Sequence, residues 1–476
     1  MEIHQHDSAE HGPHSEDFPR LELARLVGEA QRQARVRQRV QMALMGLGLF
    51  LMALGLPNER YFRSMDRLWQ LAGSGPPPQG VLTLPIYALH GMGLSLEAAV
   101  FLVNALLYGA SLWALQRMLR VVGFAWNLAW VSSLVALTCP VAWLGATLPT
   151  DYAAGVLGAA LLATELFQTK QNKAFGYLWR VSIWLVVAFL LQAQNLWLVL
   201  PAAWAVHRQA PSRDQAALRV AGLTGVWGVC MWVVFASQPE GWHALREAAF
   251  GAGFGSSSGG AHAAFWILGL GALWFGFYSL VAGGRDPEES PPPLWCWVWM
   301  AVGLIPLWSG GNSQGPMGGL LLPMAALGLA DALQRRVAPQ QLVKATLALV
   351  MAHALLITVF TISLQRDDPQ RAWQRVARQS LSSGDVFVTG QPERAYLSAF
   401  RMGLGTCQID GLGGVVHAWS PTGVTGTRLI FDAWDSPAAP DPLHWPGWLL
   451  QGAELSGAAL QTPLELHPSG LRSTGP

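Results

Sequence analysis

Apolar runs long enough to cross a lipid bilayer constrain this chain more than any other feature. A membrane-spanning helix needs about 20 consecutive, mostly apolar residues. Such runs lie at 41–57, 97–116, 124–147, 152–167, 217–236, 263–283, 294–309, 318–334 and 343–363. Charged residues make up only 12% of the chain, whereas soluble domains carry about 25%. The sequence therefore predicts an all-α polytopic membrane bundle.

One further apolar stretch, at 181–206, is interrupted by Gln192, Gln194, Asn195 and Pro201. A single helix there would move the arginines that follow it to the outer face, against the rule that short cytoplasmic loops carry the Lys and Arg residues. Two short helices that turn back at Gln194–Asn195 keep those arginines inside. We therefore expect a break at this point and about 11 membrane passes in total.

The same rule predicts the orientation and the domains of the chain. Residues 1–40 form a polar, arginine-rich tail that we expect to be cytoplasmic and disordered. Its four histidines lack a Cys or carboxylate cage, so no metal site is predicted. Residues 41–364 form the membrane domain, with an outer loop at 57–96. Residues 365–476 follow the last span and are expected on the outer side of the membrane. We expect this membrane to be the cytoplasmic (inner) membrane.

Residues 365–476 change from apolar runs to the pattern of a small soluble α/β domain. We expect helices at Gln370–Leu381 and Glu393–Leu404, a buried strand at Asp385–Thr389, and short strands near 406–410 and 428–432. Cys407 is the one cysteine in this part, so no disulfide framework is indicated.

The outer loop begins with LPNERYFRSMDRLW at 56–69, which combines acids, arginines and an aromatic residue. Glu59 and Asp66 are carboxylates that can serve as a general base and an orienting acid. Arg60 and Arg63, beside Tyr61, can bind a phosphate through charge-assisted hydrogen bonds. The alternative is an interfacial helix whose surface ion pairs contribute little.

Asp151 in the turn LPTD, and the amides of Gln194 and Asn195, are further candidates. An acid before a helix is also explained by the helix dipole, and a polar residue inside an apolar stretch is also explained by helix packing. The net charge of +1 gives no electrostatic reason to expect nucleic acid as a partner.

The order of these features resembles the GT-C class of membrane glycosyltransferases, such as protein O-mannosyltransferases and the aminoarabinose transferase of lipid A. The resemblance rests on NERYF at 58–62, a Pro-rich segment at 76–99, LPTD at 148–151, the kinked stretch FLLQAQNLWLVLPAAW at 189–204, and the late helix GLLLPMAALGLADAL at 319–333. It covers about residues 40 to 335, and Gln194 and Asn195 stand where the class usually has Lys or Arg.

The resemblance implies transfer of a sugar from a polyprenyl-phosphate carrier to a protein, glycan or lipid acceptor at the outer face. By it, Glu59 matches the catalytic base at the mouth of an outward-facing cavity, with Asp66 as the fallback, and Asp151 orients acceptor or donor. The expected substrate contacts are Arg60, Arg63, Tyr61, Gln194 and Asn195. The divalent metal requirement stays open. The alternatives are a transporter or lipid flippase, and a non-catalytic membrane assembly protein.

Overall fold

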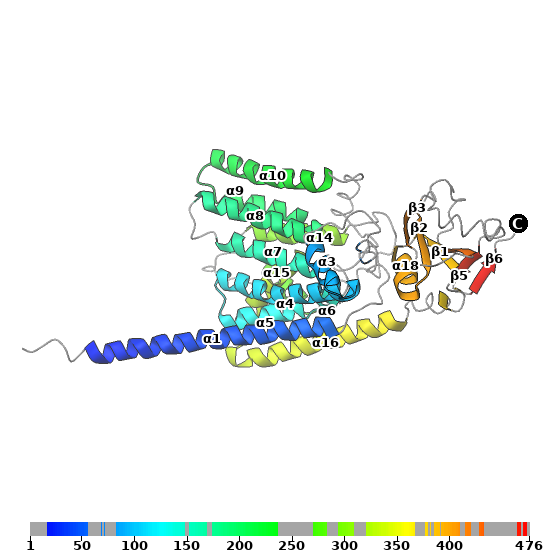
Figure 1. Ribbon diagram of the computed structural model, residues 1–476. Helices are drawn as coiled ribbons and strands as arrows, with labels where there is room; N and C mark the ends of the chain where they lie inside the picture. Colours follow the sequence, from blue (N-terminus) through cyan, green and yellow to red (C-terminus); the bar gives the residue numbers. More distant parts are fainter. Residues whose placement is uncertain are drawn as a thin grey trace, which may run out of the picture.

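The computed structural model is a helical bundle with a small mixed sheet at one end (Figure 1). It describes residues 17–55, 68, 71, 82–147, 152–168, 174–236, 270–282, 294–308, 320–366, 377–378, 381, 385–390, 392–409, 415–419, 428–432, 464–467 and 470–473. We call the end of the bundle beside the sheet the domain end, and the other end the basic end.

Helix α1 (Asp17–Gly55) is a single helix of 39 residues that projects past the basic end (Figure 1). The expectation of a disordered tail over 1–40 is therefore wrong from Asp17 onward. The polar part is rich in Ala, Leu, Arg, Gln and Glu, which all favour a helix. Where α1 enters the bundle, Gly109 of the next long helix approaches it so closely that a Cβ there would lie 2.9 Å from the Gly46 carbonyl oxygen.

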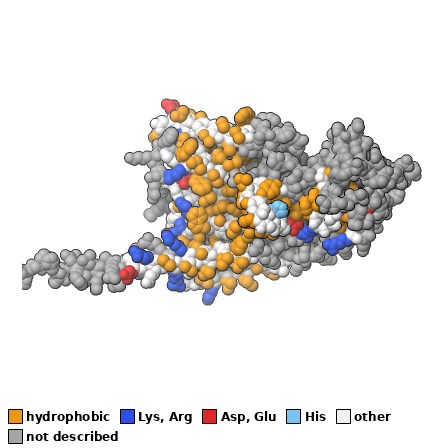
Figure 2. Space-filling model, viewed as in Figure 1, with side chains coloured by type: hydrophobic (Ala, Val, Ile, Leu, Met, Phe, Trp, Pro, Cys, Tyr) orange, Lys and Arg blue, Asp and Glu red, His pale blue; other side chains and the backbone are white. Residues whose placement is uncertain are grey.

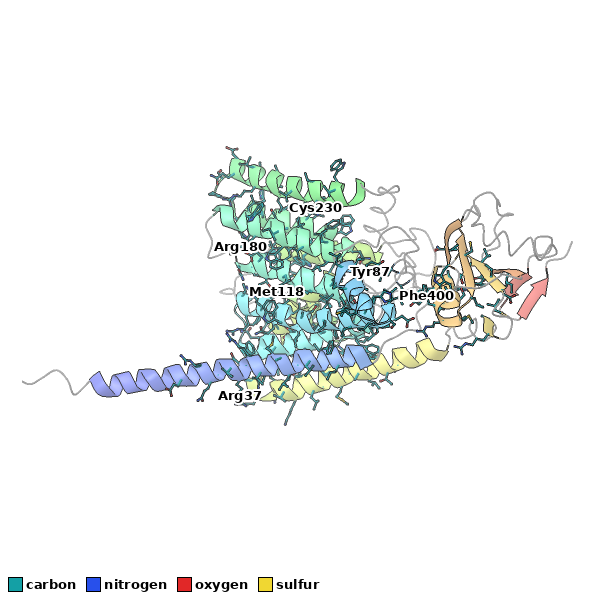
Figure 3. All side chains as sticks on the ribbon, viewed as in Figure 1. Arg37, Tyr87, Met118, Arg180, Cys230 and Phe400 are labelled. Carbon is teal, nitrogen blue, oxygen red and sulfur yellow. The ribbon has the colours of Figure 1, made fainter. Side chains whose placement is uncertain are left out.

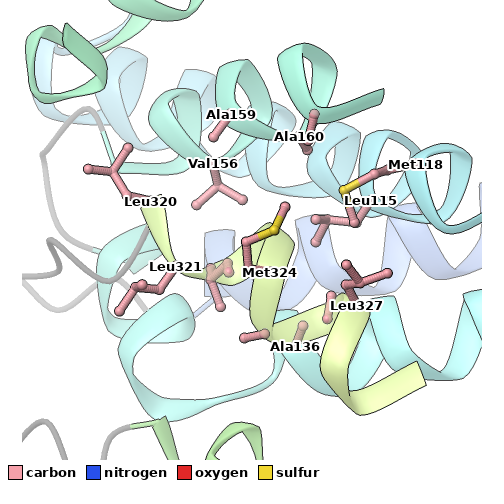
Figure 4. Close-up of a cluster of buried hydrophobic side chains, with 14 of the residues drawn as sticks. Leu115, Met118, Ala136, Val156, Ala159, Ala160, Leu320, Leu321, Met324 and Leu327 are labelled. Carbon is pink, nitrogen blue, oxygen red and sulfur yellow. The ribbon is translucent and has the colours of Figure 1, made fainter. Parts of the chain in front are cut away.

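The core of the bundle is built from α4 (Leu96–Val122) and α7 (Tyr152–Phe167), which pack along each other. Ser95 caps α4 by accepting a hydrogen bond from the Ala98 N–H at 3.2 Å. Figure 4 shows the apolar side chains between these helices and the late helix α15 (Leu322–Arg336). The expected spans 97–116, 152–167 and 318–334 correspond to these elements.

The expected span 124–147 is bent by 66° between α5 (Trp126–Leu137) and α6 (Pro140–Thr147). Pro140 has no N–H to continue the helical ladder, so carbonyls before it lose their partners. The hydroxyl of Tyr108 on α4 donates to the Leu137 carbonyl at this bend. The bend therefore keeps its backbone hydrogen-bonded inside an apolar bundle.

The stretch after α7 folds back on itself, as predicted. Helix α8 (Ala174–Leu191) is followed by the 3₁₀ turn η4 (Ala193–Leu198) and the short helix α9 (Val199–Arg208). The Gln209 side chain, just after α9, donates to the Tyr177 hydroxyl near the start of α8 at 3.2 Å. This bond joins the far ends of the two helices, so α9 returns alongside α8. The expected first boundary, 181, is late because α8 already begins at Ala174.

Four more helices complete the described part of the bundle: α10 (Arg213–Ala236), α13 (Leu273–Ala282), α14 (Leu294–Trp308) and α16 (Leu342–Arg366). By length and composition, the helical segments Leu96–Val122, Arg213–Val233 and Pro339–Val359 can each cross a membrane, and the bent α5–α6 pair is a fourth candidate. Within the expected span 263–283, residues 263–269 lie outside the described residues.

Lys and Arg side chains gather at the basic end, along one edge of the apolar surface in Figure 2. They come from the last turns of α4, α9 and α15 and from the start of α10, as Arg120, Arg208, Arg335, Arg336 and Arg213. The fold-back places the charges of α9 and α10 with the others. This distribution agrees with the positive-inside rule if the basic end is cytoplasmic.

The soluble part is a six-stranded mixed sheet with strand order β3-β2-β1-β4-β5-β6. The strands are β1 (Asp385–Thr389), β2 (Gly405–Ile409), β3 (Val415–Trp419), β4 (Arg428–Asp432), β5 (Leu464–His467) and β6 (Gly470–Ser473). Strands β1, β2, β4 and β5 are parallel, and the edge strands β3 and β6 pair antiparallel. The three expected strands are confirmed. Of the expected helix Gln370–Leu381, only 377–378 are described as helical.

The soluble domain docks on the domain end of the bundle through α18 (Pro392–Tyr396) and the π-helical turn η7 (Leu397–Arg401). One buried apolar cluster, which we call the interdomain cluster, joins both parts. It includes Leu68, Leu71, Leu82, Ile86, Ala99, Val100, Ala154, Phe387, Ala395, Leu397 and Ile430. The domain is thus packed against the bundle rather than attached only through its linker.

Candidate functional site

Most of the residues predicted to carry the chemistry lie outside the described part of the chain. These are Glu59, Arg60, Tyr61, Arg63, Asp66 and Asp151. Gln194 and Asn195 are described, and so are the chain segments that follow Asp66 and Asp151. The geometry of those segments is therefore what the structure contributes to the site.

Gln192, Gln194 and Asn195 form an amide cluster at the break between α8 and α9. Gln192 has extended backbone, with φ −153° and ψ 121°, which ends α8. The Asn195 side chain donates to the carbonyls of Ala188, at 2.8 Å, and Gly155, at 3.2 Å. The Ala188 carbonyl also accepts from the Gln192 N–H at 3.1 Å, so the Asn195 amide adds a second donor in the last turn of α8.

Two glycines of α7 make room for this break. A Cβ on Gly155 would lie 1.5 Å from the Gln192 side-chain oxygen, and a Cβ on Gly158 would lie 2.8 Å from the Ala188 Cα. The spacing of small residues on α7 therefore lets α8 and the amide cluster approach its backbone. Gly155 is four residues after Asp151, about one helical turn.

The side chains of Gln192 and Gln194 are bonded to each other and remain half-buried. The Gln192 side-chain amide donates to the side-chain oxygen (Oε1) of Gln194 at 3.2 Å. Asn195 is fully buried, and its side-chain oxygen has no hydrogen-bond partner among the described residues. Amides of this kind can donate to hydroxyl or phosphate oxygens and accept from hydroxyl groups, but they bring no charge.

Two described residues of the outer loop, Leu68 and Leu71, pack against the bundle. Leu68 and Leu71 are buried, and the Tyr87 hydroxyl donates to the Leu71 carbonyl at 2.7 Å. Both leucines belong to the interdomain cluster, together with Ala154 of α7. Leu191, the last residue of α8, packs against the same cluster. The segments that follow Asp66 and Asp151, and the one that precedes Gln192, therefore meet at the domain end.

An ion pair between α4 and the soluble domain lies at the same end, and the sequence reasoning missed it. Glu97, in the first turn of α4, accepts hydrogen bonds from Arg401 Nη2 at 3.1 Å and Arg401 Nε at 3.3 Å. The Tyr396 hydroxyl donates to the same carboxylate at 3.0 Å. In the sequence, Glu97 is a single acid at the start of a long apolar helix. The helix dipole alone explains an acid at that position.

A second polar group is buried inside the soluble domain. Arg394 of α18 forms an ion pair with Asp432 at the end of β4, and Thr389 at the end of β1 donates to the same carboxylate at 3.0 Å. The three side chains are each at most 1% exposed. They fasten α18 to the carboxyl ends of the two central parallel strands, which fixes the surface that docks on the bundle.

No group of three or more His, Cys, Asp or Glu side chains that could hold a metal ion is found within the described ranges. Burial raises the pKa of the Cys407 thiol to about 12, so this cysteine, which is also fully buried, is a core residue of the sheet.

Comparisons with known proteins give matches among solved structures, two of which are described below, and no relative by sequence. No protein-family model matches the chain, and a search of curated proteins finds no match. The crystal structure of ArnT from Cupriavidus metallidurans bound to undecaprenyl phosphate aligns with a TM-score of 0.49 and 15% identity, over 77% of this chain and 85% of that one. Its apo form gives 0.48 and 16%, over 75% and 83%. We therefore base the functional proposal on the residues of this chain.

Proposed function

We propose that this protein is an integral membrane glycosyltransferase that moves a sugar from a polyprenyl-phosphate carrier to an acceptor at the outer membrane face. The proposal rests on one observation: two segments of the chain contribute residues to the interdomain cluster, and a third packs against it. Leu68 follows Asp66 by two residues, Ala154 follows Asp151 by three, and Leu191 precedes Gln192. Two or three residues of chain span at most about 11 Å, which supports the proposal that Asp66 and Asp151 border the same region as the amides, with Glu59 earlier in the same loop.

The position of this region suits a lipid-linked donor. It lies where the apolar bundle ends and the soluble domain begins, so a polyprenyl tail can stay in hydrocarbon while its phosphate is held at the surface. Arg60 and Arg63, with Tyr61, are proposed to bind that phosphate. Gln194 is proposed to bind sugar hydroxyls, and Asn195 to hold the turn that presents it.

The proposed chemistry is displacement at the anomeric carbon. Glu59 takes the proton from the acceptor hydroxyl as its oxygen attacks the anomeric carbon. The bond from that carbon to the phosphate oxygen breaks, and the leaving polyprenyl phosphate keeps the electron pair, stabilised by the arginines. Asp151 orients the acceptor or the donor. Asp66 is the fallback base.

Substitution of the two loop acids tests this assignment. Glu59→Gln is expected to lower transfer of radiolabelled sugar from a panel of polyprenyl-phosphate hexoses by about 10²–10⁴-fold, the usual contribution of a general base. Asp66→Asn is expected to cost less. Glu29→Gln, on the exposed polar part of α1, is the matched control. Full activity of Glu59→Gln together with a clear loss in Asp66→Asn would transfer the role to Asp66.

A transporter or lipid flippase is the second candidate, because two spans are interrupted inside the bundle, at η4 and between α5 and α6. Interrupted helices commonly line substrate pathways in transporters. Reconstitution in vesicles separates the two functions. Movement of a polyprenyl phosphate between leaflets without sugar transfer, unaffected by Glu59→Gln, would favour the transporter.

A further inference from the structure

Helix α3 (Thr83–Gly91) exposes an apolar face at the domain end. It contains no Lys, Arg, Asp or Glu. Leu84 is 75% exposed and Tyr87 40% exposed, and Met92, just after the helix, is 70% exposed. Its other face is anchored, because Ile86 is buried in the interdomain cluster. The helix therefore holds an uncharged, apolar surface outward on a fixed base.

The depth of α3 relative to the membrane follows from its connection to α4. Only the residues 92–95 separate it from Leu96, where a membrane-spanning helix of 27 residues begins. The turn is ordered by two bonds, from the Ala98 N–H to Ser95 and between His90 Nδ1 and the Leu94 carbonyl at 2.8 Å. Helix α3 thus lies at the boundary between the bilayer and water.

The soluble domain brings a further aromatic side chain to the same depth. Arg401 and Tyr396 both contact Glu97, the second residue of α4. Phe400 lies between them in sequence, is 43% exposed, and has its ring centroid 5.0 Å from that of Tyr396. Figure 3 shows Tyr87 and Phe400 on the two sides of the junction between bundle and domain.

We propose that Leu84, Tyr87, Met92 and Phe400, which we call the interfacial patch, insert into the outer-leaflet boundary between headgroups and acyl chains. The patch continues the lipid-facing surface of the bundle, where α4 exposes Leu106 and Trp113; Figure 2 shows apolar side chains covering this face. Aromatic residues favour this depth of the membrane. Helix α3 offers no Lys, Arg, Asp or Glu to pair with a charged protein surface, and the Nδ1 of its His90 is bonded to the Leu94 carbonyl.

This insertion gives the soluble domain a second support. The Glu97–Arg401 pair and the interdomain cluster hold the domain to the bundle, and Phe400 then holds it to the lipid itself. The domain is thereby held at the membrane surface beside α3. This proposal stands independently of the proposed sugar transfer.

Spin labels measure the depth directly in the full chain reconstituted in phospholipid nanodiscs. The background carries Cys230→Ala, because Cys139, Cys296 and Cys407 are buried and Cys230 is half-buried. Nitroxides are attached at Leu84→Cys and Phe400→Cys, with Ala88→Cys as a second site on the same exposed face of α3. Gln33→Cys, exposed on the polar part of α1 that projects past the basic end, is the aqueous control, and Leu355→Cys, 66% exposed on α16, is the hydrocarbon control.

The ratio of oxygen to nickel-chelate accessibility at the α3 sites and at 400 is expected to be several-fold above the Gln33 control and below the Leu355 control. A ratio equal to that of Gln33 at either place would overturn the proposal for that part of the patch. Labels that are shielded from both reagents, and that become accessible on dilution to one copy per disc, would mean that a second copy covers the patch, which also overturns it.

Discussion

At the scale of single residues, Asn195 is the side chain on which the shape of the candidate site depends most. Its amide donates to carbonyls on two helices, at Gly155 and Ala188. Asn195→Ala removes both hydrogen bonds, each worth about 0.5–1.5 kcal/mol, and is expected to destabilise the protein by about 1–3 kcal/mol, although the Ala188 carbonyl keeps its bond from the Gln192 N–H. Thermal unfolding in detergent measures this loss.

Gln194→Ala is the matched control for that substitution, because Gln194 is half-buried and its one side-chain bond is to Gln192. We expect it to shift the melting temperature less than Asn195→Ala. Equal melting of Asn195→Ala and wild type would show that the break between α8 and α9 does not need this amide.

Cys407 gives a second residue-scale prediction, on pH. Its thiol is buried and its pKa is raised to about 12, whereas an exposed thiol titrates near about 8.5. The thiolate is the reactive form, so iodoacetamide should leave Cys407 unmodified in the folded protein at pH 8.5 and modify it after unfolding. Because the folded state holds the proton more tightly, this contribution to stability is complete below about pH 8.5 and is lost as the pH rises toward 12. Rapid modification in the folded state, read by mass spectrometry of the peptide, would contradict the burial.

At the scale of elements, His353 on α16 joins the start of α13 to the bend between α5 and α6. Its Nε2 accepts from the Ala272 N–H at 3.0 Å, just before α13, and its Nδ1 lies 3.5 Å from the Thr138 hydroxyl at the α5–α6 bend. Gly271 there has φ +50°, and a Cβ would lie 2.8 Å from His353 Nε2. The glycine therefore permits both the turn and the close approach of the imidazole.

Removal of that imidazole is expected to loosen α13. His353→Leu leaves the Ala272 N–H without its acceptor and should cost about 1–3 kcal/mol, measured as a lower melting temperature in detergent. His353→Gln should recover part of the loss, because its carbonyl oxygen can accept. Leu355→Ala, on the exposed face of the same helix, is the control. A melting temperature as low for Leu355→Ala as for His353→Leu would point to α16 packing as the cause.

At the scale of the whole molecule, the charge distribution predicts the orientation. The arginines of α4, α9, α10 and α15 share the end opposite the soluble domain, so the basic end is expected in the cytoplasm and the C-terminus outside. Alkaline phosphatase fused at the C-terminus should be active, and Arg208→Cys should react with an impermeant maleimide only after permeabilisation. An inactive fusion, or labelling of intact cells at 208, would reverse the orientation.

The sequence predicted the parts of the fold that depend on local pattern. The uninterrupted apolar runs located α4 and α7, and the position of the arginines after Pro201 required the fold-back around η4. The polar half of α1 was misread because charge was taken for disorder, although its residues favour a helix. Strands β5 and β6 were missed because runs of four residues between turn-forming residues give little periodic signal, and the edge strand β3 was missed although it is as long as the three strands that were predicted.

The candidate site was predictable only in outline. The acids and amides were recognised by residue type and position in the chain order. Contacts such as Arg401 with Glu97 join residues 304 apart in sequence, and no local pattern encodes which distant side chain an acid will meet. The convergence of the segments around Leu68, Ala154 and Leu191 is visible only in the tertiary packing of the interdomain cluster.

The length of α1 has a mechanical consequence. At about 1.5 Å per residue, the segment Asp17–Arg39 of this continuous helix is about 34 Å long, roughly the thickness of the hydrocarbon layer itself. A helix of this kind acts as a stiff spacer. Anything bound at its N-terminal end is held at that distance from the bilayer. A torque or tilt applied there is transmitted to the contact between Gly46 and Gly109, where the backbones of α1 and α4 are too close to admit a Cβ on Gly109.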